Sequence, residues 1–467
     1  MLSQGPPGGR DIGSDHFRKI VRMLTRWFQL HARGTTVARE LQAGVTTFAA
    51  MAYILAVNPG ILSATGMDRG ALVTVTAMSA AAATALMALL TNYPLALAPG
   101  MGINAFFTYT ICLGAGVPWQ QALGMVFVNG CLFLLLSASG IRERVIRAIP
   151  HALTLAITAG IGLFIVFIGL KNGGVVVASP ATLVTHGDFA SGSTALCLGG
   201  LALTAVLMAR RVPGAIVLGM LVTTLAGVLV PDGKGGTLTS LPASIFAWPA
   251  SPAPLMLALD FGFLRSSDAF LAALPLVLTL LLVDMFDNIG TLIGVTRRAG
   301  LLDAQGNLPG VGRVLAADSL AAIMSALLGT STVVSYVESV SGVEAGGRTG
   351  LTGLTTATCF VLALVATPLI LAVPAAATAP ALIIVGSLML RSASEIDMRD
   401  FATAVPAVLT LVTVPLLFSI ADGIGFGLIA TAVLGLGTGR PRTLTVTGYV
   451  IAVVFALQFF RLFPFNG

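Results

Sequence analysis

The stretch PLVLTLLLVDMFDNIGTLIGV (275–295) decides the fold, because it places two carboxylates in a run that is otherwise apolar or small. Asp284 and Asp287 lie in it, and a second such stretch, GTSTVVSYVESVSG (329–342), holds Glu338. An ionised acid at the centre of a bilayer costs at least about 2.5–3.5 kcal/mol on insertion scales. Acids persist there when they face a protein interior or a wet cavity. The pattern therefore indicates a path for a proton, an ion or a polar substrate.

The composition around these stretches is that of an integral membrane protein. Of the 467 residues, 56% are hydrophobic and only 9% are charged. Soluble domains carry roughly 25% charged residues. The apolar runs are continuous and about 20 residues long, which predicts helices rather than the alternating strands of a barrel. We therefore expect one all-α polytopic domain.

Fourteen apolar segments are expected, in two sets of seven that flank a polar, Pro/Gly-rich stretch ending near 267. The first set lies at about 44–63, 71–91, 96–111, 119–138, 150–170, 195–210 and 214–231. The second set lies at about 268–296, 313–329, 331–345, 351–373, 379–391, 401–419 and 422–437. Because each set is odd in number, the second starts from the opposite side of the membrane, as in the inverted repeats of secondary transporters. A tail run at 443–462 either spans the membrane or lies along it.

Basic residues determine the expected orientation. The net charge is +6, and the arginines gather in short loops, which is the positive-inside pattern rather than a nucleic-acid surface. With the N-terminus in the cytoplasm, the basic loops hold Arg142, Arg144, Arg147, Arg210, Arg211, Arg297, Arg298, Arg348, Arg391, Arg399, Arg440 and Arg442. We expect the inner (plasma) membrane. The basic and aromatic residues of 16–42 form either an amphipathic helix on an anionic membrane surface or a solvated arm.

The third and tenth segments differ from the others. The third reads YPLALAPGMGINAFFTYT (93–110) and the tenth reads GTSTVVSYVESVSGVEAGGRTG (329–350), and both are short and rich in Gly, Ser, Thr or Pro. Broken segments at matching places in two halves indicate the central site of a transporter. Their backbone has to be buried in protein or line a cavity, because lipid cannot satisfy unpaired peptide groups.

The acids in these segments suggest the chemistry of the site. Asp284 and Asp287 are three residues apart on one helix, so two ionised carboxylates would repel and one is expected to hold a proton. The alternative is a structural acid bonded to helix ends or hydroxyls. Glu338 is placed to accept N–H bonds from a ligand, and its alternative role is a cap on the half-helix that follows.

Other polar residues have weaker assignments. The amide of Asn104 can both donate and accept, and Phe106 supplies either an aromatic wall or packing. Glu344 and Arg348 are four residues apart and are expected to pair, and Asp318 is expected at a helix start. The sequence contains no GxSxG, HExxH, Walker-type loop or metal-ligand spacing, and its four cysteines are scattered. We therefore expect no enzyme activity, cofactor or metal.

Four motifs, taken in order, resemble one family of transporters. They are QAGVTTFAAMAYILAVNPGIL (42–62), LALAPGMGINAFFTYT (95–110), VDMFDNIGTLIGV (283–295) and GTSTVVSYVESVSGVEAGGRTGLT (329–352). Over about residues 36–460 the chain resembles the adenine/guanine/hypoxanthine permease (AzgA-like) branch of the nucleobase–cation symporters, within the xanthine/uracil permeases. The resemblance implies fourteen segments as a 7+7 inverted repeat with core and gate domains. Short antiparallel strands of segments three and ten would meet at the substrate site.

The resemblance also implies roles for residues. Glu338 would hold the base, Asp287 would match the acid of the eighth segment, and Asp284 and Asn104 would be further polar positions. Proton coupling would involve Asp287, Asp284 and Glu338. The remaining substrate contacts would come from Gly102, Ala105, Phe106 and Ser339.

Two departures from the family pattern leave these acids in place. Asn288 replaces the Thr of DxFDTxGT, and Val334 and Ser335 alter the TxTxYxES tract. Both changes bear on which purine is preferred.

The implied protein is a proton-driven symporter that imports adenine, guanine or hypoxanthine by an elevator-like movement. Its parts would be a cytoplasmic arm (1–43) and a transporter domain (44–463), with a core at about 44–138 and 268–373, a gate at about 150–231 and 379–437, and the extra segment 443–462. An anion carrier of the same fold (sulfate, bicarbonate or dicarboxylate) and a passive facilitator are the alternatives. Three acids at the site favour a neutral, N–H-rich ligand. The expected partners are the purine, the proton and membrane lipid, without nucleic acid, and a homodimer is left open.

Overall fold

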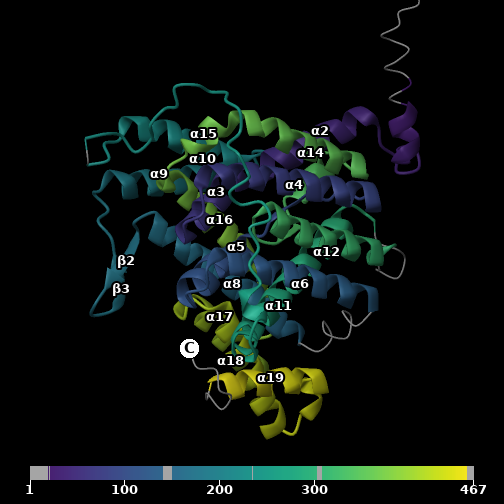
Figure 1. The fold of residues 1–467 in the computed structure, drawn as a ribbon, viewed down its shortest axis with the longest axis vertical. Coiled ribbons are helices and arrows are strands. Elements are labelled where there is room, and N and C mark those ends of the chain that lie inside the picture. The colour runs from purple at the N-terminus through teal and green to yellow at the C-terminus, as the bar shows by residue number, and fades with distance from the viewer. Residues whose placement is uncertain (1–18, 20–21, 140–149, 234, 302–307, 460–467) are drawn as a thin grey trace, which may run out of the picture.

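A bundle of long helices makes up most of the molecule (Figure 1). The computed structural model describes residues 19, 22–139, 150–233, 235–301 and 308–459, without the side chains of 286–290, 293–294, 297 and 458. Ten helices in the described ranges are long and apolar enough to cross a membrane. Shorter apolar helices lie at Met101–Gly114, Ala215–Leu229, Phe401–Leu416 and Val446–Leu457. The predicted polytopic all-α fold is therefore confirmed.

The described residues of the first half, from Val37 onward, form seven segments and one hairpin. Its helices and strands are α2 (Val37–Met51), α3 (Ile54–Leu62), α4 (Arg69–Thr91), β1 (Leu97–Pro99), α5 (Met101–Ala105), the π-helix η2 (Phe106–Gly114), α6 (Trp119–Ser139), α8 (His151–Asn172), β2 (Val176–Ser179), β3 (Leu183–His186), α9 (Gly192–Ala209) and α10 (Ala215–Ala226). The antiparallel hairpin β2–β3 projects from one end of the bundle, and the sequence pattern did not predict it.

The second half repeats this order of long and broken segments. It contains α11 (Ser267–Arg298), α12 (Val311–Leu328), β4 (Val333–Ser335), α13 (Ser339–Glu344), α14 (Gly350–Ala363), α15 (Thr367–Leu371), α16 (Ala375–Met389), α17 (Phe401–Leu416), α18 (Ile420–Gly437) and α19 (Val446–Phe459). Short 3₁₀ turns lie at Ser63–Thr65, Gly227–Leu229, Gly262–Leu264, Leu364–Ala366, Leu390–Glu395 and Pro441–Thr443.

Local sequence explains where several helices begin. Thr36 and Asp68 accept hydrogen bonds from the backbone N–H groups of Arg39 (3.4 Å) and Ala71 (2.7 Å), so α2 and α4 begin at capped positions. The cap at Thr36 starts the first helix before the apolar run at 44. Pro150 and Pro374 directly precede α8 and α16, where the missing N–H of proline costs no helical bond.

Two segments are interrupted where the apolar pattern is continuous. The first span breaks at Ala52–Tyr53, between α2 and α3. The eleventh segment breaks into α14, a 3₁₀ turn and α15, and Pro368 lies at the start of α15. Hydropathy did not predict either break. The basic loop with Arg142, Arg144 and Arg147 lies outside the described residues.

The helices α8 and α16 approach each other closely through glycine. A Cβ atom built on Gly162 would lie 2.7 Å from the carbonyl oxygen of Gly386, and a Cβ on Gly386 would clash with the carbonyl oxygen of Gly162. Small residues at a crossing allow two membrane helices to pack backbone against backbone. This contact joins the fifth and twelfth segments, which occupy equivalent places in the two halves.

Candidate functional site

The broken third and tenth segments meet as a short sheet near the middle of the bundle. The strands β1 and β4 are antiparallel, with Leu97 opposite Ser335 and Pro99 opposite Val333. The pairing is extended by bonds from the Gly100 N–H to the Thr332 carbonyl (3.0 Å) and from the Tyr336 N–H to the Ala96 carbonyl (2.9 Å). Each strand thereby satisfies backbone groups that lipid could not. The short strands implied by the resemblance are confirmed.

Glu338 stands between the strand β4 and the helix α13. It is half-buried, and one carboxylate oxygen accepts a hydrogen bond of 2.6 Å from the hydroxyl of Tyr53. It occupies the N-cap position of α13 but its side chain makes no capping bond there. The capping role that was the alternative is therefore wrong, and the carboxylate instead faces the first span.

Tyr53 is a site residue that the sequence analysis missed. It lies at the break of the first span, and its side chain is fully buried. Because a helix break turns the chain, the phenol can reach across to a segment that is distant in the sequence. The tyrosine in AAMAYILAV (49–57) is a lone hydroxyl-bearing ring in an apolar run, and a buried phenol normally has a hydrogen-bond partner.

Asn104 presents an amide next to the strand pair. It is fully buried in α5, and its side-chain carbonyl oxygen accepts a hydrogen bond from the hydroxyl of Ser331. Its Nδ2 group has no hydrogen-bond partner among the described residues. A buried donor without a partner costs about 1–3 kcal/mol, so it is poised to donate to an incoming acceptor.

The remaining predicted contact residues are all buried, and two of them have clear neighbours. A Cβ atom on Gly102 would lie 2.6 Å from Cγ2 of Ile161 on α8, so this position needs glycine for close packing. The hydroxyl of Ser339 accepts a bond from the Ala96 N–H (3.0 Å) and thus holds the strand β1. Ala105 and Phe106 lie in the hydrophobic core. Their contact with a base stays a prediction.

Of the two predicted coupling aspartates, the structure describes the side chain of one. Asp284 is buried in α11 and accepts a hydrogen bond of 3.2 Å from Nδ2 of Asn129 on α6. Sequence reasoning did not single out Asn129. The side chains of Asp287 and Asn288 lie outside the described residues, so the expected pairing of the two aspartates stays a prediction.

Glu40 on α2 is another buried carboxylate, and the sequence analysis did not single it out. It accepts hydrogen bonds from the backbone N–H of Arg348 (2.9 Å), from the hydroxyls of Thr349 (2.8 Å) and Thr352 (2.6 Å), and from the N–H groups of both threonines. These donors surround the start of α14, where an anion also complements the helix dipole. Glu40 therefore fastens the first span to the eleventh.

Two of the weaker assignments are wrong. Glu344 pairs with Arg298 on α11 at 3.0 Å rather than with Arg348, whose guanidinium donates to the carbonyl oxygen of Val343 (2.6 Å). Asp318 is buried inside α12 and lies beyond its first turn, so it is not at a helix start. The partner of Glu344 and the burial of Asp318 both depend on how neighbouring helices pack. The spacing of residues along one helix does not show this packing.

We expect Tyr53→Phe to weaken substrate binding at least about tenfold, because one hydrogen bond to a charged group contributes about 1.5–3 kcal/mol. The ring would still fill its buried position, so the variant removes only the hydrogen bond to Glu338. Concentration-dependent uptake should show a raised KM with a nearly unchanged maximal rate. Tyr449→Phe removes a hydroxyl that bonds to the Pro441 carbonyl in the tail region and should leave both values unchanged. An unchanged KM in Tyr53→Phe would contradict the assignment.

A strand pair inside a helical membrane bundle, with an acid beside it, defines a membrane transporter of the inverted-repeat class. The permease family model matches residues 38–428, and the chain belongs to this family, as its motifs predicted. It is 40% identical to the adenine permease AdeP of Escherichia coli over 93% of this chain and 96% of that protein. It is 43% identical to the guanine/hypoxanthine permease PbuG of Bacillus subtilis over 94% of this chain and all of that protein.

A solved structure shares the fold. The transmembrane domain of the cyanobacterial bicarbonate transporter BicA superposes with a TM-score of 0.62, at 17% identity, over 82% of this chain and 96% of that one. This likeness confirms the 7+7 inverted-repeat architecture. Like the other members of its family, the protein is a permease and not an enzyme.

Proposed function

We propose that the protein imports purine nucleobases by proton symport across the inner membrane. The observation that carries the proposal is the Glu338 carboxylate, which lies beside the strand pair and is bonded to Tyr53. The names of AdeP and PbuG, which align along nearly their whole length, support the substrate class.

A purine base suits the polar groups of this site. Guanine and hypoxanthine carry ring N–H groups beside a carbonyl oxygen, and adenine carries an exocyclic amine beside ring nitrogens. Glu338 would accept the N–H groups, while Nδ2 of Asn104 would donate to a carbonyl oxygen or a ring nitrogen. A carboxylate and a neutral amide at these two positions, rather than cations, favour a neutral ligand over an anion.

The coupling proton is assigned to the aspartates of α11. Asp284 is buried against Asn129 on α6, and Asp287 follows it by one helical turn. A change in the burial or the partners of an acid shifts its affinity for a proton, which couples proton binding to a conformational change. We propose that Asp287, with Asp284, exchanges the proton as Glu338 binds and releases the base.

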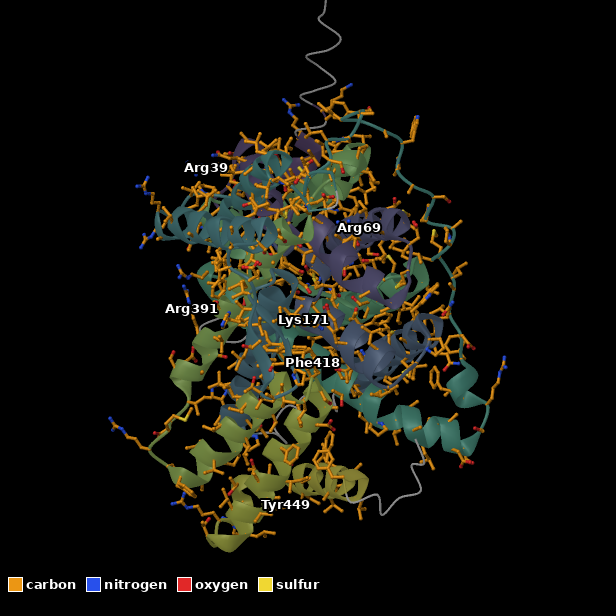
Figure 2. The ribbon with its side chains drawn as sticks, turned by 90° about the vertical axis from the view of Figure 1, so that its left-hand side faces the viewer. Arg39, Arg69, Lys171, Arg391, Phe418 and Tyr449 are labelled. Carbon is orange, nitrogen blue, oxygen red and sulfur yellow. The ribbon has the colours of Figure 1, made fainter. Side chains whose placement is uncertain are left out.

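One hydrogen bond between the predicted core and the predicted gate would have to break in an elevator movement. The hydroxyl of Thr110, in the third segment, donates to the carbonyl oxygen of Phe418 between α17 and α18 at 2.8 Å. Within the predicted gate, the ammonium of Lys171 lies 5.7 Å from the ring centre of the same Phe418, and Figure 2 shows the two side by side. We propose that the hydrogen bond from Thr110 to Phe418 holds one end state of the movement of segments 44–138 and 268–373 against 150–231 and 379–437, with the N-terminus in the cytoplasm.

Uptake of radiolabelled adenine, guanine and hypoxanthine, in cells that lack their own purine permeases, tests the proposal. We expect uptake of at least one purine and its loss when a protonophore collapses the proton gradient. Purine uptake that survives the protonophore but requires Na⁺ would replace the proton with sodium, and uptake that needs neither would indicate a facilitator. A well-expressed protein that takes up no purine would contradict the substrate class and favour an anion carrier.

A further inference from the structure

A short helix before the first span is fastened to the ends of other spans. Residues 22–27 are helical, and α2 begins at Val37. Phe28 is buried against Leu351 of α14. The carbonyl oxygen of Phe28 accepts a hydrogen bond of 3.0 Å from Nδ2 of Asn92, the residue that ends α4.

The same asparagine ties this helix to a third segment. Oδ1 of Asn92 accepts a hydrogen bond of 2.8 Å from the N–H of Gly350, the first residue of α14. The guanidinium of Arg33 lies over the ring of Tyr93, 5.5 Å from its centre. The helix is therefore anchored where α2 begins, α4 ends and α14 begins, at the opposite end of the bundle from the hairpin β2–β3 (Figure 1). Ends of membrane-spanning helices lie at the membrane boundary, so the helix lies there too.

The two sides of this helix differ in chemistry. Leu24 and Phe28 face the protein and pack with Leu351. The opposite side carries a basic stripe, defined as Lys19, Arg22, Met23, Arg26 and Trp27. Within residues 22–27, spacing of three and four residues places Arg22, Met23, Arg26 and Trp27 on one helical face, and Lys19 lines the same hollow. The stripe holds three cations and no acid, and lines an open hollow of about 540 Å³.

Two side chains of the basic stripe are unusually exposed for their chemistry. Trp27 is 67% exposed and Met23 is 59% exposed. Tryptophan is enriched at the level of lipid headgroups. There its ring contacts apolar groups while its N–H donates a hydrogen bond to a polar group or to water. Lysine and arginine next to an apolar side chain extend their charged ends to the same level.

We propose that the basic stripe binds anionic phospholipid headgroups of the membrane that the protein spans. Lys19, Arg22 and Arg26 contact the phosphates, and Trp27 and Met23 enter the boundary between headgroups and acyl chains. Charge complementarity with an anionic leaflet, together with the anchoring of the helix at the membrane boundary, selects lipid as the partner. The proposal is independent of which substrate the permease carries.

Trp27 is itself the probe for the test, because the chain has only three tryptophans. The full-length variant W119F/W248F leaves Trp27 as the only one. It is reconstituted in vesicles of phosphatidylcholine alone or of an equimolar mixture with phosphatidylglycerol. Trp27 emission is then measured with acrylamide, a neutral quencher in the water, and with lipids brominated near the headgroup.

In phosphatidylglycerol vesicles we expect blue-shifted emission, at least twofold weaker quenching by acrylamide and stronger quenching by brominated lipid, with a partial reversal at high salt. K19Q/R22Q/R26Q should abolish the dependence on phosphatidylglycerol. The matched variant R210Q/R211Q/R391Q removes three exposed charges elsewhere and should retain it. The proposal would be overturned if acrylamide quenched Trp27 fully in both lipids, or if K19Q/R22Q/R26Q left the lipid dependence unchanged. Either result would favour the alternative of a solvated arm.

Discussion

Replacing Glu338 by alanine is expected to abolish purine uptake while the protein still reaches the membrane. The carboxylate is the proposed acceptor of two N–H groups of the base and is already bonded to Tyr53 at 2.6 Å. Hydrogen bonds to a charged group contribute about 1.5–3 kcal/mol each, so losing two should lower uptake by at least about 100-fold. Initial rates of radiolabelled uptake, normalised to the amount of protein in the membrane, measure the effect.

Glu344→Ala is the matched control for this prediction. Glu344 ends the same helix, α13, and its exposed ion pair with Arg298 belongs to a class that contributes only about 0–1 kcal/mol. The Glu344→Ala variant should take up purines at a nearly wild-type rate. Glu338→Gln keeps the shape of the side chain but not its charge, and should be nearly as inactive as Glu338→Ala. Near-normal uptake in Glu338→Gln would rule out the carboxylate as the acceptor of the base.

Replacing Glu40 by alanine is expected to destabilise the folded protein strongly. Five donors at the start of α14, from Arg348, Thr349 and Thr352, would lose their acceptor in a fully buried position. Removing one partner from a buried charged network costs about 3–5 kcal/mol. The midpoint of thermal unfolding in detergent, followed by fluorescence-detected gel filtration, should fall by several degrees.

Two further variants separate this effect from a general loss of charge. Glu40→Gln retains one acceptor oxygen and should be intermediate in stability. Glu395→Ala removes an exposed carboxylate and should unfold at the wild-type temperature. If Glu40→Ala were as stable as Glu395→Ala, the network around α14 would not hold the first and eleventh segments together.

Much of the fold was predictable because it rests on local properties of the chain. Segment length and apolar content predicted the spans, and the small residues of 93–110 and 329–350 predicted the two broken segments that form β1 and β4. The break at Ala52–Tyr53 was not predictable in this way, because hydropathy averages over about 19 residues and a two-residue turn leaves the average high.

The site was predictable only in part. Glu338 and Asp284 were recognised because an acid in an apolar run is costly wherever it lies. Their partners Tyr53 and Asn129 were missed, because burying a neutral phenol or amide costs much less than burying an ionised acid, so the signal is weaker.

The sequence by itself determined that this chain is a membrane permease with an inverted repeat, since hydropathy, charge placement and motifs are read along the chain. Only the tertiary structure decided which groups meet. Tyr53 and Glu338 are 285 residues apart, Glu40 and Thr349 are 309 apart, and Asn129 and Asp284 are 155 apart. Helical periodicity shows which face of a segment is apolar but not which helix packs against it, so pairs of polar residues on different helices become visible only once the helices are assembled.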